Sequence, residues 1–321
     1  MPDLIRPAFL FWGMAERYDD PVLRFAQELE LQAAKRVEGF LTGKHKSPFQ
    51  GFSVEFAEHR PYNAGESIRN MDWKLLARTD KHYIKRYEAE TNLRCYLAID
   101  VSGSMHYPKR DAPSLNDPNK LSFSTLSAAA LMHLLKKQRD AFGLALFGQQ
   151  VDHLSPAKLG TLHHKSLLNS LARITYAEAQ ATDLPACLHE LAERIPSRSM
   201  VVLFSDWLQD PEQLKELEAA LQHIRFCGHD LIVFHVHDRK TEMELDIGKQ
   251  TTRLIDLETG EELRVEPSQI RAPYQKLLDE YRKSIKGICK RAGADWFEAD
   301  VARGVQPLLL QFLRKRKQWL R

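Results

Sequence analysis

The chain has 321 residues, of which 43% are apolar, with only 15 glycines and 15 prolines. This composition is typical of a globular chain of one large or two modest domains, and it excludes a disordered, collagen-like or small disulfide-stapled protein. The 46 basic and 43 acidic side chains leave a formal charge of +3. That charge is too close to balance to indicate nucleic-acid binding by the chain as a whole.

The start of the chain predicts neither a membrane span nor an export signal. Its longest uncharged apolar stretch, residues 7–15, is followed by Glu16 and Arg17, whereas a bilayer span needs about 20 apolar residues. The acidic Asp3 ahead of this stretch, and the lack of a small-residue cleavage site behind it, argue against a signal peptide. We therefore expect a cytoplasmic protein. The four cysteines form no C-x-x-C pair, which favours reduced thiols over zinc or disulfides.

The first part of the chain predicts a helix followed by a charged module. Apolar residues recur at helical spacing from Asp20 to Phe40. Residues 44–90 are rich in basic and aromatic side chains, and the short alternating runs Phe52–Phe56 and Tyr83–Tyr87 indicate half-exposed strands. We expect residues 1–91 to form a helix plus a small β-rich cassette.

From residue 92 onward, buried strands alternate with helices. The expected strands are Leu93–Ile99, Ala141–Phe147, Met200–Phe204 and Leu231–Val236. The expected helices are Leu121–Lys137, His163–Ile174, Leu184–Ile195, Pro211–Phe226, Ile270–Cys289 and Val305–Arg316, with a hairpin at Thr251–Val265. This order predicts an α/β domain over residues 92–321 with a doubly wound, mostly parallel, Rossmann-like sheet. Such sheets bind ligands beyond the carboxyl ends of their strands.

Oxygen-bearing side chains follow two of the expected strands at that edge. The first strand leads into Asp100, Ser102 and Ser104, at alternate positions that place their oxygens on one side of the loop. The strand Met200–Phe204 leads into Asp206. An oxygen-only ligand set suits a hard cation, Mg²⁺ or Mn²⁺, better than zinc.

The order of these residues resembles the metal-ion-dependent adhesion site of von Willebrand factor A-type domains. In that family a D-x-S-x-S motif is followed by a threonine that opens a helix and by an aspartate at a later strand end. The resemblance implies that Asp100, Ser102, Ser104, Thr182 and Asp206 together hold the metal. Thr182 departs from the family pattern because no glycines precede it.

A second resemblance comes from residues 51–79, GFSVEFAEHRPYNAGESIRNMDWKLLART. This stretch is similar to the signature of the bacterial domain of unknown function 58 family, whose members join such a cassette to a von Willebrand A-like half. Family members are commonly encoded beside MoxR-type AAA+ ATPases. The resemblance therefore implies a non-enzymatic adaptor or chaperone accessory to such an ATPase, bound through an acidic side chain that completes the metal site.

The charged cassette allows two interpretations. Its acidic and basic side chains are dense enough to pair with each other as a salt-bridged scaffold. Alternatively, its basic side chains form a partner-binding surface, because guanidinium groups recognise carboxylates and phosphates. The candidates for that surface are Arg60, Arg69, Lys74 and Arg78.

The same residues also allow interpretations other than a metal-dependent adaptor. Asp, Ser and Gly are also ordinary turn and helix-cap residues. A Mg²⁺-dependent phosphatase or hydrolase using Asp100 and Asp206 would resemble haloacid dehalogenases, but Ser102 stands where those enzymes need an acidic group. The chain has no G-x-S-x-G elbow and no phosphate-binding P-loop. His235 and His237 share one strand face, but no third ligand is evident, so we expect no metal there.

Overall fold

The computed structural model describes residues 20–42, 58–61, 73–79, 83–86, 93–176, 181–248, 250–257 and 260–319. The chain divides into two compact units. The smaller covers residues 41–92, and the larger takes in the chain before residue 41 and from Leu93 onward. The larger unit thus resumes at Leu93, after the smaller one ends. Most of helix α2 (Pro21–Thr42) belongs to the larger unit, whereas the sequence places it with the charged cassette.

The described part of the smaller unit contains one hairpin and one short helix. Strands β1 (Glu58–Pro61) and β2 (Tyr83–Arg86) pair antiparallel, and helix α3 covers Trp73–Thr79. The strand expected at Tyr83 is confirmed. The strand expected at 52–56 lies outside the described residues.

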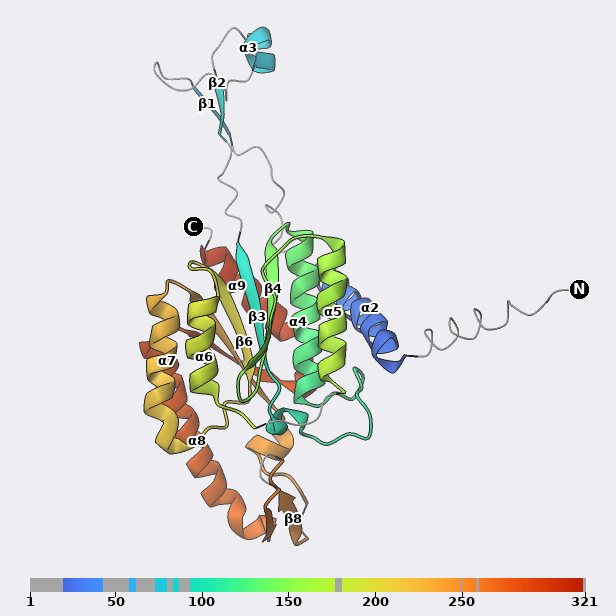
Figure 1. Ribbon diagram of the computed structural model, residues 1–321, viewed down its shortest axis with the longest axis vertical. Coiled ribbons are helices and arrows are strands. Elements are labelled where there is room, and N and C mark those ends of the chain that lie inside the picture. The colour runs from blue at the N-terminus through green and yellow to red at the C-terminus, as the bar shows by residue number, and fades with distance from the viewer. Residues whose placement is uncertain are drawn as a thin grey trace, which may run out of the picture. The chain divides into compact units, whose positions relative to one another are not determined.

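The larger unit is built on a six-stranded sheet with helices on both faces (Figure 1). Across the sheet the strands are β10 (Asp295–Asp300), β7 (Asp230–His237), β6 (Met200–Ser205), β3 (Arg94–Asp100), β4 (Ala141–Phe147) and β5 (Val151–Leu154). All neighbours pair parallel except β4 and β5. The expected mostly parallel α/β sheet is confirmed, and the two outer strands β5 and β10 are additions that the sequence did not predict.

Helices cover the sheet because each presents an apolar face to it. Figure 1 shows α6, α7 and α8 on one side of the sheet, and α4 and α5 on the other. Helix α9 packs against α4 and β10. The bounds are α4 (Lys120–Lys137), α5 (Thr161–Ile174), α6 (Leu184–Arg194), α7 (Leu214–Phe226), α8 (Pro267–Arg291) and α9 (Gln306–Trp319). Short helical turns are η3 (Gly103–His106), η4 (Pro211–Gln213), η5 (Arg239–Met243) and η6 (Val301–Arg303).

Helix α2 groups with the larger unit through its own apolar face. Phe25, Leu29 and Val37 are spaced for one side of a helix and all three are buried. The Phe25 ring meets the ring of Tyr176 edge to face, with centroids 5.9 Å apart. These contacts explain why α2 does not belong with the cassette that follows it in sequence.

The hairpin expected at 251–265 is confirmed, as strands β8 (Thr252–Ile255) and β9 (Glu262–Val265) pair antiparallel. Within the described ranges, no helix combines the length and apolar character needed to cross a bilayer. All four cysteines are free thiols: Cys95, Cys187 and Cys289 are buried and Cys227 is half-buried.

Candidate metal centre

The topology brings two carboxylates to one point at the carboxyl edge of the sheet. Strand β3 has β4 on one side and β6 on the other, so the winding of the sheet reverses between β3 and β6. Ligands of doubly wound sheets bind at such a switch point. Asp100 is the last residue of β3, and Asp206 directly follows the end of β6.

Asp100 is held rigidly by the turn that it opens. Its side chain is 1% exposed. One carboxylate oxygen accepts the backbone N–H of Ser102 at 2.9 Å, and the other accepts the Ser205 hydroxyl at 2.6 Å. Burial, followed by the nearby charge of Asp206, raises the pKa of Asp100 to about 7. A bound cation would lower the pKa of Asp100 instead, because it favours the ionised carboxylate.

The two serines lie beside this carboxylate with their hydroxyls together. The Oγ atoms of Ser102 and Ser104 are 3.1 Å apart, and Ser104 is close enough to Asp206 to help lower the pKa of that carboxyl. Adjacent ligands of an octahedral Mg²⁺ ion with bonds of 2.0–2.1 Å stand about 2.9 Å apart. The separation of the two hydroxyls is therefore suitable for adjacent positions on such an ion.

Asp206 has a buried cationic partner that the sequence did not suggest. The Lys120 ammonium lies 2.8 Å from a carboxylate oxygen of Asp206 and 2.5 Å from one of Glu242, on η5. The Lys120 side chain is fully buried and that of Asp206 is 4% exposed. Burial alone would raise the pKa of Asp206, but the charge and hydrogen bond of Lys120 outweigh it and hold that pKa below its usual range.

The lysine itself stays charged. Burial disfavours the ammonium form, but the two carboxylates outweigh that effect and raise the pKa of Lys120 above its usual range. Lys120 begins helix α4, which Asn119 caps by accepting the backbone N–H of Ser122 at 2.8 Å. The cap fixes the helix start, and with it the point from which the lysine side chain reaches Asp206.

Thr182 lies at the same edge of the sheet but in a separate contact. Its hydroxyl lies 3.4 Å from the carbonyl oxygen of Gly148, the residue after β4. Phe147, at the end of β4, pairs with Asp100. Thr182 precedes helix α6, which Asp183 caps. The structure thus brings Asp100, Ser102, Ser104 and Asp206 into one hydrogen-bonded group, whereas Thr182 is directed at a neighbouring carbonyl.

These side chains fit a hard cation by the chemistry of their donors. Every candidate ligand atom is oxygen, two carboxylates supply the charge, and two hydroxyls are correctly spaced. Asp100, Ser102 and Ser104 would be direct ligands. Asp206 shares its carboxylate with Lys120, which suits contact through a metal-bound water.

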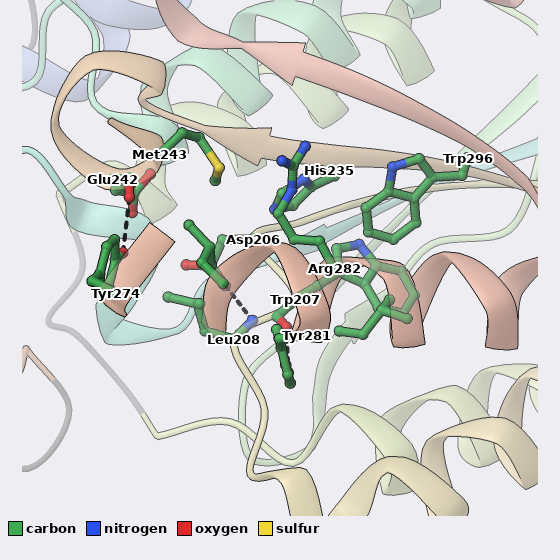
Figure 2. A pocket seen from close by; sticks show the side chains of 12 residues that line it. Asp206, Trp207, Leu208, His235, Glu242, Met243, Tyr274, Tyr281, Arg282 and Trp296 are labelled. Carbon is green, nitrogen blue, oxygen red and sulfur yellow. Dashed lines mark hydrogen bonds between the residues drawn. The ribbon is translucent and has the colours of Figure 1, made fainter. Parts of the chain in front are cut away.

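Asp206, one member of this group, lines a solvent-open pocket (Figure 2). Asp206 and Glu242 line it together with aromatic side chains from α8 and β10. Tyr281 fixes one wall, because its hydroxyl donates to the carbonyl of Trp207 at 2.9 Å and accepts the backbone N–H of Gln209 at 2.9 Å. The candidate metal centre therefore borders a cavity rather than a closed core.

The four cassette residues proposed for partner binding are far from this group in sequence. Arg60 lies on β1, and Lys74 and Arg78 lie on α3. Arg69 lies outside the described residues. Lys120 and Glu242 are the residues that sequence analysis missed, because no local pattern distinguishes them from surface charges.

Comparison with known proteins identifies the family. The family model described as "Protein of unknown function DUF58" matches residues 58–284, more than half of the chain. The chain belongs to this family. Two relatives are uncharacterized proteins of Mycobacterium tuberculosis and Mycobacterium bovis. Each is 25% identical to this chain over 317 residues, and the match covers 95% of this chain and 94% of the relative.

Solved structures were also compared with this DUF58 chain. An aerotolerance-related membrane protein from Bacteroides fragilis is 15% identical in sequence, with a TM-score of 0.42. The match covers 70% of this chain and 99% of that protein's chain. The protein BatB from Bacteroides thetaiotaomicron is 13% identical with coverages of 70% and 99% and a TM-score of 0.38. The SpRpn10 VWA domain is 13% identical with coverages of 46% and 76% and a TM-score of 0.28.

Proposed function

We propose that this DUF58 protein is a non-enzymatic, cytoplasmic interaction module that binds an acidic partner through a divalent cation, Mg²⁺ or Mn²⁺. The observation that carries the proposal is the convergence of Asp100, Ser102, Ser104 and Asp206 at the switch point of the sheet. Thr182, on the loop that opens α6, completes the proposed ligand set through rotation of its side chain or through water.

The charges of the proposed ligands explain why the partner should be acidic. Asp206 is shared with Lys120, so only Asp100 delivers its full negative charge to the cation. The serine ligands are neutral. A cation held in this way stays electrophilic, and a carboxylate donated by a partner gains a charge-assisted bond in a partly dehydrated site. An exposed ion pair would contribute much less.

The proposed partner is a MoxR-type AAA+ ATPase or a client delivered to it. This choice rests on the family resemblance, because such ATPases commonly accompany DUF58 proteins. The basic side chains of the cassette, Arg60, Arg69, Lys74 and Arg78, form the proposed second contact.

The phosphatase alternative shares the carboxylates Asp100 and Asp206 with the proposal but lacks a third acidic group. Two residues after Asp100 the chain carries Ser102, whose hydroxyl contacts Ser104. A neutral hydroxyl cannot serve as the general acid that phosphoryl transfer by an aspartate requires. The buried Lys120 is fully engaged by two carboxylates, which leaves it no free role in such chemistry.

The test is a binding measurement between the purified full-length chain and the MoxR-type ATPase encoded nearest to it. We expect association in millimolar Mg²⁺ and a loss of at least tenfold in affinity in EDTA. The double variant Ser102→Ala/Ser104→Ala should lose as much. Folding should stay intact because Asp100 keeps the Ser102 backbone N–H and the Ser205 hydroxyl, and Asp206 keeps Lys120. The matched control is Ser166→Ala/Ser170→Ala on α5, which should bind normally. Equal binding in EDTA and by the Ser102/Ser104 variant would contradict the proposal.

A further inference from the structure

A second group of ligand-type side chains lies on the other half of the sheet. His235 and His237 alternate along β7, so their side chains share one face. Glu298 on β10 stands directly opposite His235 in the parallel register, and its side chain comes to the same face. Within the ranges that the structure describes, one nitrogen of each histidine and one carboxylate oxygen lie within 4.8 Å of one another.

The spacing of these atoms suits a tetrahedral metal ion. The Nδ1 atoms of His235 and His237 lie 3.0 and 3.6 Å from the same oxygen, Oε2 of Glu298. Zinc bonds to nitrogen and oxygen of about 2.0–2.1 Å place neighbouring ligands of a tetrahedron about 3.3 Å apart. The two observed distances lie on either side of that value, so small side-chain rotations would complete the geometry.

Glu298 divides its two oxygens between different neighbours. Oε1 is within hydrogen-bond distance of Arg282 at 2.8 Å, Lys286 at 2.7 Å and the Trp296 indole N–H at 3.0 Å. No such cation reaches Oε2 among the described residues, and this oxygen faces only the two histidines. The contacts at Oε1 orient the carboxylate, as outer partners of metal ligands commonly do, and they leave Oε2 for an ion.

His237 has one further contact. Its Nδ1 lies 3.1 Å from the carbonyl oxygen of His235. In the geometry proposed here this nitrogen would bind the ion, so the ring would give up that hydrogen bond when the metal binds.

We propose that His235, His237 and Glu298 form a second metal site, specific for a transition-metal ion of the zinc class. The ion would replace the proton that His235 and Glu298 share across their 3.0 Å hydrogen bond. Nitrogen donors select zinc over magnesium, so this site is chemically distinct from the oxygen-only group at Asp100.

One of the three proposed ligands borders a solvent-open pocket. His235 lines the same solvent-open pocket as Asp206 and Glu242, next to Trp296 and Arg282. Figure 2 shows His235 and Arg282 between Met243 on one side and Trp296 on the other. Zinc sites with three protein ligands commonly take water or an exogenous ligand as the fourth, and the pocket beside His235 is where such a ligand would enter.

The experiment is calorimetric titration of the full-length chain with Zn²⁺ in the presence of millimolar Mg²⁺. We expect one Zn²⁺ per chain that Mg²⁺ does not displace. Glu298→Gln and His237→Phe should each weaken it at least tenfold, the second while keeping a ring that packs beside His235. Two variants should retain Zn²⁺ binding. Asp100→Asn alters the proposed Mg²⁺ site and should leave this one intact. His223→Ala breaks the pair of His223 on α7 with His189 on α6, which is not part of the site.

A change of charge beside Glu298 distinguishes metal binding from a purely structural role of this carboxylate, because only a bound ion would respond to it. Lys286 lies 2.7 Å from Oε1 of Glu298, and its charge repels a cation bound at Oε2. Lys286→Gln keeps a hydrogen-bond donor, and Arg282 and Trp296 still orient the carboxylate, so the loss of charge should tighten Zn²⁺ binding severalfold. Unchanged Zn²⁺ affinity in folded Glu298→Gln and His237→Phe would overturn the proposal. So would loss of the site in His223→Ala, or equal or weaker binding by Lys286→Gln.

Discussion

Replacing Lys120 by methionine removes an ammonium group that joins Asp206 to Glu242. The substitution keeps the length and apolar character of the side chain but leaves two carboxylates close together without their cation. Breaking a buried ion pair by removing one partner costs about 3–5 kcal/mol. In a domain of this size, each kcal/mol of lost stability lowers the melting temperature by about 2–4 °C. Without divalent ions, Lys120→Met should therefore melt roughly 6–20 °C lower than the unmodified chain.

Divalent ions should restore much of this loss. Once the lysine is gone, Asp206 and Glu242 add their negative charge to that of Asp100, so a bound cation is attracted more strongly. We expect Mg²⁺ to raise the melting temperature of Lys120→Met more than that of the unmodified chain, and calorimetry to show tighter Mg²⁺ binding. Thermal unfolding followed by circular dichroism, with and without Mg²⁺, measures both effects.

The matched control lies at the other end of the same helix. Lys137 ends α4, where it contacts Glu38 at 3.4 Å as an exposed pair. Lys137→Met should change stability by less than about 1 kcal/mol. If Lys120→Met melts within 2 °C of the unmodified chain, or if Mg²⁺ stabilises both proteins equally, then the lysine does not neutralise the proposed metal group.

Two further predictions concern stability. His164 is 1% exposed, neither ring nitrogen has a hydrogen-bond partner among the described residues, and burial lowers its pKa from 6.5 to about 4. As the pH falls, His164 takes up a proton in the unfolded chain before it does so in the folded chain. The free energy of unfolding is therefore unaffected by this histidine above pH 6.5, and it falls by up to about 3 kcal/mol toward pH 4. His164→Phe should flatten that part of the pH profile in urea unfolding; an unchanged slope would refute the assignment. Deleting residues 1–90 removes α2 and uncovers the surface on which Phe25, Leu29 and Val37 pack, so the remainder should be insoluble or molten; a cooperative melt of residues 91–321 would contradict this.

Much of the sheet could be predicted from the sequence because its central strands are locally distinct. Strands β3, β4, β6 and β7 are continuous apolar runs, and their buried positions explain those runs. The motif around Asp100 could be found for the same reason, since its residues are close together in the chain and directly follow a recognisable strand. Strand order then places Asp206 beside it.

The features that were missed depend on long-range contacts or on weak local patterns. Lys120 and its partners Asp206 and Glu242 are separated by 86 and 122 residues, and a lysine at a helix start ordinarily lies in solvent. Strand β10, Asp-Trp-Phe-Glu-Ala-Asp, is polar and mostly half-buried, so it has no apolar run to indicate a strand. Without an expected strand at β10, the sequence could not place Glu298 beside His235 and His237.

The central claim is that a divalent cation binds at Asp100, and a titration with Mn²⁺ tests it most directly. The electron paramagnetic resonance signal of free Mn²⁺ reports how much ion the full-length chain binds, and competition with Mg²⁺ reports whether both ions share the site. We expect one Mn²⁺ per chain, displaced by Mg²⁺, with most of the affinity lost in Asp100→Ala and none lost in Asp111→Ala, which removes an exposed aspartate. Equal Mn²⁺ binding by Asp100→Ala and the unmodified chain would contradict the claim.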